Sequence, residues 1–73
     1  MKVKINLDTR TAAARLVALA ATIKEPVYLH DGANMCVSAK SLLGALCAQF
    51  DFTEIWLETT HDHYSLFEEF VAE

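Results

Sequence analysis

The chain has 73 residues, of which 53% are hydrophobic and 22% are charged, and its formal net charge is -4. This length supports one small hydrophobic core, so we predict a single domain over residues 1–73. The apolar content excludes a disordered chain. The six Lys and Arg residues are scattered along an acidic chain, which argues against a nucleic-acid partner.

The longest mostly apolar stretch, residues 12–23, is interrupted by Arg15 and is shorter than the roughly 20 residues that a membrane span needs. The N-terminal segment alternates polar and apolar residues and leads into no signal-peptide pattern, so the expected compartment is the cytoplasm. Cys36 and Cys47 show neither CxxC spacing nor a paired histidine pattern. We therefore expect two reduced thiols, no cofactor and no membrane partner.

The first elements along the chain are a strand and a helix. Val3, Ile5 and Leu7 alternate with polar residues, which is typical of a half-buried strand. Apolar residues at spacings of three and four predict a helix over residues 9–22. Pro26 follows shortly after and closes this helical segment.

A hairpin is predicted next. Residues 27–30 and 35–37 form two short apolar segments around the turn-forming residues 31–34. Gly32 can take a positive φ, which tight turns between antiparallel strands require. The two segments are therefore predicted to pair as antiparallel strands.

The second half of the chain predicts a helix, a strand and a last helix. Ser38 is a candidate N-cap for a helix that ends near Gln49. Residues 54–59 alternate as a strand, and residues 64–72 are amphipathic. The expected apolar face of the middle helix consists of Leu42, Leu43, Leu46 and Cys47.

The element order β-α-β-β-α-β-α predicts an α+β fold. Because strands and helices are interleaved, one sheet is expected to carry helices on one face and to leave the other face to water. No repeat or low-complexity segment divides the chain.

Two junctions carry a resemblance to a known family. Residues 6–13 read Asn-Leu-Asp-Thr-Arg-Thr-Ala-Ala, and residues 37–44 read Val-Ser-Ala-Lys-Ser-Leu-Leu-Gly. With the element order, they resemble HPr, the histidine-containing phosphocarrier of the bacterial sugar phosphotransferase system. The resemblance implies an HPr-like open-faced β-sandwich with a four-stranded antiparallel sheet in the order 1-4-2-3. The chain departs from the family at Asp8, which replaces the phosphorylated histidine, and at Thr11, which replaces a proline.

Asp8, with Arg10 as its charge partner, is therefore the candidate phosphoacceptor position. Carboxylates can form acyl phosphates, but aspartyl-phosphate sites generally add magnesium and several acidic ligands, and no such cluster lies nearby in the sequence. The alternative is that Asp8 caps the following helix, because Asp is a preferred N-cap residue.

The resemblance implies two further features. Ser41 matches a serine that a dedicated kinase phosphorylates in Gram-positive members, and a phosphate in the first turn of a helix suits the helix dipole. Alternatively, Ser41 is an ordinary solvated helix residue. The implied partner-binding surface consists of Arg10, Thr11, Lys40, Leu42 and Leu43.

Trp56 is expected on the open face of the sheet. The implied strand order places it near Tyr28 and His30. Exposed aromatic side chains in one patch indicate an interface, including one between two copies of the chain, although cross-strand packing explains them equally well.

His61 and His63 have the spacing of a metal-binding pair. They precede a short helix, however, and capping of that helix by Asp62 or His63 accounts for the pattern. No metal site is therefore predicted.

The favoured function is a non-catalytic regulatory or protein-interaction module of the phosphotransferase system, with protein partners and a possible switch at Ser41. One alternative is an active phosphoryl carrier that uses Asp8. Another is a self-associating structural module that pairs through Tyr28 and Trp56.

Overall fold

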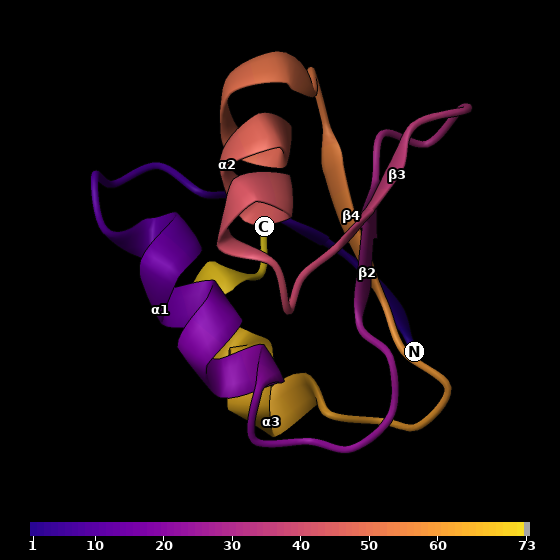
Figure 1. The fold of residues 1–73 in the computed structure, drawn as a ribbon. Helices are drawn as coiled ribbons and strands as arrows, with labels where there is room; N and C mark the ends of the chain where they lie inside the picture. Colours follow the sequence, from indigo (N-terminus) through magenta and orange to yellow (C-terminus); the bar gives the residue numbers. More distant parts are fainter. Residues whose placement is uncertain (73) are drawn as a thin grey trace.

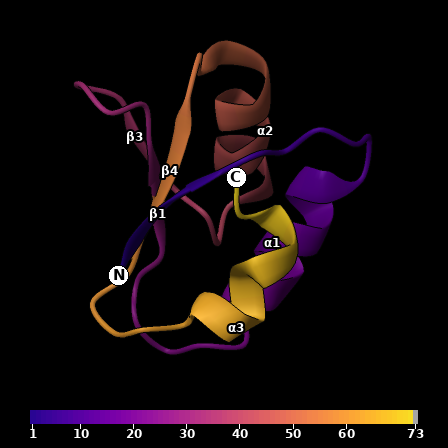
Figure 2. The same cartoon turned by 180° about the vertical axis from the view of Figure 1, so that it is seen from behind.

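The computed structural model describes residues 1–72. It has an α+β fold in which the helices lie on one face of a single sheet (Figures 1 and 2). None of the helices within residues 1–72 is long and apolar enough to cross a membrane. In chain order the elements are β1 (Lys2–Ile5), α1 (Ala12–Ala20), β2 (Tyr28–His30), β3 (Cys36–Ser38), α2 (Leu42–Asp51), β4 (Ile55–Glu58), α3 (Tyr64–Phe67) and the 3₁₀ turn η1 (Glu68–Phe70).

The sheet is antiparallel and has the order β1-β4-β2-β3, so the predicted strand order is confirmed. Leu29 of β2 lies opposite Leu57 of β4, and both side chains are fully buried under the helices. At the edge of the sheet, Val71 forms a bridge with Ile5. The C-terminal segment therefore covers part of the outer edge of β1, which would otherwise offer unpaired backbone groups.

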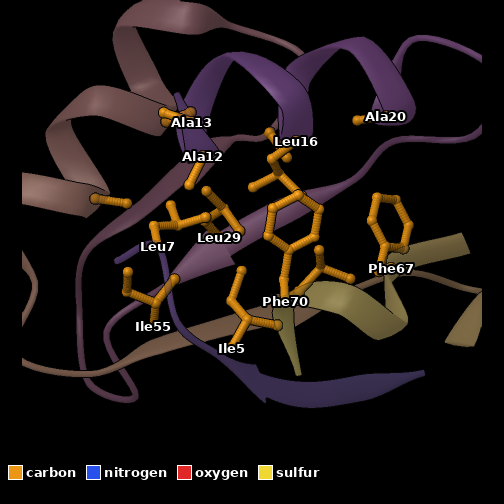
Figure 3. Packing of buried hydrophobic residues seen from close by; sticks show 14 of the residues in the cluster. Ile5, Leu7, Ala12, Ala13, Leu16, Ala20, Leu29, Ile55, Phe67 and Phe70 are labelled. Carbon is orange, nitrogen blue, oxygen red and sulfur yellow. The ribbon is translucent and has the colours of Figure 1, made fainter. Parts of the chain in front are cut away.

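One hydrophobic core lies between the sheet and the helices. Leu16 of α1 and Phe70 of η1 point toward one another across it (Figure 3). The buried residues of α2 are only Ala45 and Ala48, so α2 can lie close to α1 and to the sheet. The buried hydrophobic residues are Ile5, Leu7, Ala12, Ala13, Leu16, Ala20, Val27, Leu29, Ala39, Ala45, Ala48, Ile55, Leu57, Phe67 and Phe70.

The predicted turn of the hairpin is confirmed, since Gly32 has φ +83°. The helix boundaries differ more. The helix predicted over residues 9–22 is the shorter α1, and the segment predicted over residues 64–72 is split into α3, η1 and an extended end. Ser38 does not cap α2, because its hydroxyl accepts from the backbone N–H of Lys40 at 3.1 Å in a turn that precedes the helix.

The predicted apolar face of α2 is not the side of the helix that is buried. Leu43 is 79% exposed and Leu42 is 49% exposed, whereas Ala45 and Ala48 face the core. Apolar residues occupy two opposite faces of α2, so the spacing of its apolar residues does not identify the side that packs on the sheet.

Candidate functional site

Asp8 lies exposed on the loop between β1 and α1 and does not cap the helix. The N-cap residue of α1 is Thr11, whose side chain makes no capping hydrogen bond. Its hydroxyl instead accepts from Nη1 of Arg15 at 2.7 Å. The backbone makes one turn before the helix, in which the Ala12 N–H donates to the Thr9 carbonyl at 3.2 Å. The capping role considered for Asp8 is therefore wrong.

Gln49 of α2 holds this loop in place. Its Nε2 donates to the carbonyl oxygens of Leu7 and Thr9, each at 2.9 Å. These two bonds fix the backbone on either side of Asp8 against the C-terminal half of α2. This role could not be predicted from the sequence, because a single glutamine in a mostly apolar helix matches no motif.

A cavity of about 210 Å³ opens beside Asp8, between the start of α1 and η1. The cation that lines it is Arg15 rather than Arg10. Arg15 pairs through Nη2 with the Glu69 carboxylate at 3.2 Å, and its guanidinium lies 5.7 Å from the centre of the Phe70 ring. The cavity is lined by Asn6, Asp8, Thr9, Ala12, Arg15, Glu69, Phe70 and Val71.

The charges around this cavity determine what it can hold. Asp8 and Glu69 contribute two carboxylates, and Arg15 contributes one guanidinium that Glu69 already pairs. A bound phosphoryl group carries negative charge, so it would meet two like charges and one compensated opposite charge. The cavity is therefore poorly suited to an anion.

Ser41 occupies the N-cap of α2, and its hydroxyl accepts from the Gly44 N–H at 3.1 Å. Beside it, Nζ of Lys40 donates to the carbonyl of Ile23, just beyond the end of α1, at 2.6 Å. These contacts place the start of α2 next to the end of α1, so the two helices are antiparallel (Figure 1).

The two junctions that resemble the family consequently lie at opposite ends of α2. Ser41 begins the helix, and Gln49, near its other end, contacts the Asp8 loop. A helix rises about 1.5 Å per residue, which separates these positions by roughly 12 Å along the axis.

The implied partner-binding residues divide between the two ends of α2 in the same way. Lys40, Leu42 and Leu43 lie at one end of α2, and Arg10 and Thr11 follow the loop at the other end.

An apolar surface connects the two ends. Leu43 and Phe50 of α2 are 79% and 78% exposed, and Leu46 and Cys47 lie half-buried between them. Spacings of three, four and seven place these four side chains on one face of the helix. We call this set the outer stripe. Sequence reasoning overlooked Phe50, although the absence of any charged residue from 42 to 50 was visible.

The open face of the sheet exposes less apolar surface. Trp56 lies opposite His30 in the register, as the strand order predicts, and it is half-buried. Nζ of Lys2 lies 5.4 Å from the centre of its ring, and the Gly32 turn lies close to its indole nitrogen. Tyr28 is 44% exposed. Trp56 is thus partly covered by its own chain, unlike Leu43 and Phe50.

His61 and His63 both contact one carboxylate, that of Glu25. Nδ1 of His61 lies 3.0 Å from Oε2, and Nε2 of His63 contacts Oε1. The Thr60 hydroxyl and the His61 backbone N–H also donate to Oε2. Hydrogen bonds from Thr60, then His63 and His61, lower the pKa of Glu25 from its usual value of 4.5.

This cluster accounts for the histidine spacing without a metal. Glu25 precedes β2, and the two histidines precede α3, so the contacts join two loops beside the core. The N-cap residue of α3 is His63, whose side chain makes no capping hydrogen bond. Asp62 lies one residue earlier, and its Oδ1 accepts from the Tyr64 N–H at 2.9 Å. Within residues 1–72, no three His, Cys, Asp or Glu side chains form a group that could hold a metal ion.

Comparison of the chain with protein-family models, with curated proteins and with solved structures finds no match.

Proposed function

We propose that the chain is an HPr-like protein-interaction module of the phosphotransferase system that has lost phosphoryl transfer. It binds a partner of the carrier protein without passing on a phosphoryl group, and it therefore acts as a decoy or regulator. The outer stripe carries this proposal, because it is the most exposed apolar surface of α2 and it connects Ser41 with the Asp8 loop.

The Asp8 position supports the loss of transfer. A carrier site needs donors and cations that accept the charge of the phosphoryl group. Here Arg15 is engaged by Glu69, and Asp8 adds a negative charge to the same cavity. Acyl phosphate formation at Asp8 would have to overcome this repulsion.

The outer stripe supports binding to a protein. Full burial of a Leu or Phe side chain is worth roughly 1.5–3 kcal/mol each. Leu43 and Phe50 are mostly exposed, so most of this free energy is available to a partner. Exposed apolar side chains gathered on one surface are typical of protein interaction sites.

Ser41 supports regulation of the same surface. Its hydroxyl is exposed at the N-terminus of α2, two residues before Leu43. A phosphate here would suit the helix dipole and so leave the fold intact. It would also place a charge at the edge of the apolar stripe, where it disfavours burial against an apolar partner.

The test is competition in a reconstituted reaction. Enzyme I, HPr and phosphoenolpyruvate from the organism that encodes the chain are mixed, and the rate of HPr phosphorylation is followed while the protein is added. We expect inhibition that excess HPr relieves. Leu43→Glu and Phe50→Glu are each expected to weaken inhibition by about tenfold or more, since they place a charge in the contact.

The matched control is Ser65→Glu, which adds the same charge on the exposed surface of α3 and should leave inhibition unchanged. Absence of inhibition at any concentration would contradict the decoy function. Equal inhibition by wild type and both stripe variants would show that the outer stripe is not the binding surface.

A further inference from the structure

The outer stripe makes α2 apolar on two opposite faces. Its inner face packs through Ala45 and Ala48, and its outer face exposes Leu43 and Phe50. An apolar face of a helix is normally buried against another element. We propose that a second copy of this chain covers the outer stripe, with the two α2 helices packed antiparallel about a two-fold axis.

The order of the side chains fits such an axis. A two-fold axis between Leu46 and Cys47 places Leu43 of one copy against Phe50 of the other, and the reverse contact forms at the opposite end. The large exposed side chains then lie at the two ends, and the half-buried pair lies at the crossing point.

The charges at the ends of α2 favour the antiparallel arrangement. Lys40 precedes the helix, Asp51 is its last residue, and no charged residue lies from 42 to 50. An antiparallel pair brings Lys40 of each copy toward Asp51 of the other and aligns the helix dipoles in opposite directions. Lys40 uses one donor for the Ile23 carbonyl, and its ammonium has two more.

A dimer of this kind would regulate the proposed docking surface, and to that extent the inference rests on the proposed function. One helix face buries less than the ~800 Å² per partner of a standard interface, so the dimer is weak and depends on concentration. Because the dimer covers the outer stripe, only the monomer can bind another protein.

Sedimentation equilibrium over a range of protein concentrations tests the dimer directly and needs no other protein. Wild type should form a reversible dimer. Leu43→Glu and Phe50→Lys should each raise the dissociation constant by about tenfold or more. An equimolar mixture of the two variants should recover most of this loss, because the new carboxylate at position 43 faces the new ammonium at position 50. The control Ser65→Glu should dimerise with the same dissociation constant as the wild type.

Three results would overturn the inference. The first is a wild type that stays monomeric at every concentration. The second is a dimer that neither stripe variant weakens. The third is an equimolar mixture of the two stripe variants that dimerises no better than each variant alone, while circular dichroism shows that both variants are folded. This result would exclude the antiparallel arrangement. The competition assay, run at concentrations where the protein is monomeric, is independent of all three. Inhibition without dimerisation would retain the proposed function, and dimerisation without inhibition would retain only this inference.

Discussion

Ser41 and Asp8 differ in how they are bonded to the helix that follows each of them. The Ser41 hydroxyl accepts from the Gly44 N–H and is part of α2. Asp8 lies four residues before α1, and the cap position there belongs to Thr11. Substitution at Ser41 therefore affects stability as well as binding, whereas substitution at Asp8 affects mainly the chemistry of the neighbouring cavity.

Ser41→Ala should destabilise the protein by about 1 kcal/mol, because the Gly44 N–H loses its side-chain acceptor. Ser41→Asp should keep wild-type stability, since Asp caps helices as well as Ser does. Urea unfolding of the three proteins measures the difference. Equal stability of Ser41→Ala and wild type would show that the cap contributes nothing. The stability of Ser41→Asp also makes it a suitable mimic of the phosphorylated state in binding assays.

Glu25 should make stability depend on pH in acid. Its hydrogen bonds hold its pKa in the folded protein below the usual value of 4.5, so the ionised carboxylate stabilises the fold above that pH. This stabilisation is lost as the pH falls through the lower folded pKa. Wild type should therefore exceed Glu25→Gln in stability at neutral pH, and the difference should shrink in acid.

Urea unfolding of both proteins at neutral pH and at about pH 3 measures this effect. The control is Glu54→Gln, because Glu54 makes only a long, exposed contact with Lys4 at 3.7 Å. Its substitution should change stability little at either pH. A difference between wild type and Glu25→Gln that is the same at both pH values would contradict the role of the ionised carboxylate.

At the scale of elements, the sequence was sufficient to predict that each strand and helix exists, but not which side of α2 is buried. Alternation identified the strands, and Gly32 identified the hairpin turn. The buried side of α2 depends on the small residues Ala45 and Ala48, which carry little signal beside Leu42 and Leu43. The bonds from Gln49 to the Asp8 loop were also unpredictable, since a glutamine side chain can bond many backbone groups.

Gly44 illustrates how closely α2 approaches the sheet. A Cβ at this position would lie 2.8 Å from the carbonyl oxygen of Ser38, which is backbone and cannot move aside easily. Although Ala favours helices by about 1 kcal/mol over Gly, we expect Gly44→Ala to destabilise the protein by about 1 kcal/mol or more.

Thermal or urea unfolding measures this change. Ala18→Gly on the exposed face of α1 is the control, and it should cost about 1 kcal/mol through helix propensity alone. Stabilisation by Gly44→Ala would show that the contact with Ser38 is looser than the structure indicates.

At the scale of the molecule, the element order predicted one sheet with helices on one face, and the resemblance to HPr implied the strand order that the sheet has. The contacts between segments far apart in the sequence were not predictable. Val71 pairs with Ile5, and Glu25 contacts His61 and His63, which lie 36 and 38 residues further along the chain. Such contacts join positions far apart in the sequence, and no local pattern in either segment specifies its partner. The antiparallel placement of α1 and α2, which separates Asp8 from Ser41, depends on the same kind of contact.

We propose that this fold binds as a carrier protein does without accepting a phosphoryl group. The most direct test is intact mass after incubation with phosphoenolpyruvate, magnesium and Enzyme I, for wild type, Asp8→Asn and Asp8→His. We predict that wild type and Asp8→Asn keep their mass, and that Asp8→His gains one phosphoryl group because the scaffold still docks. A phosphoryl group gained by wild type and not by Asp8→Asn would contradict the claim and identify Asp8 as an acceptor.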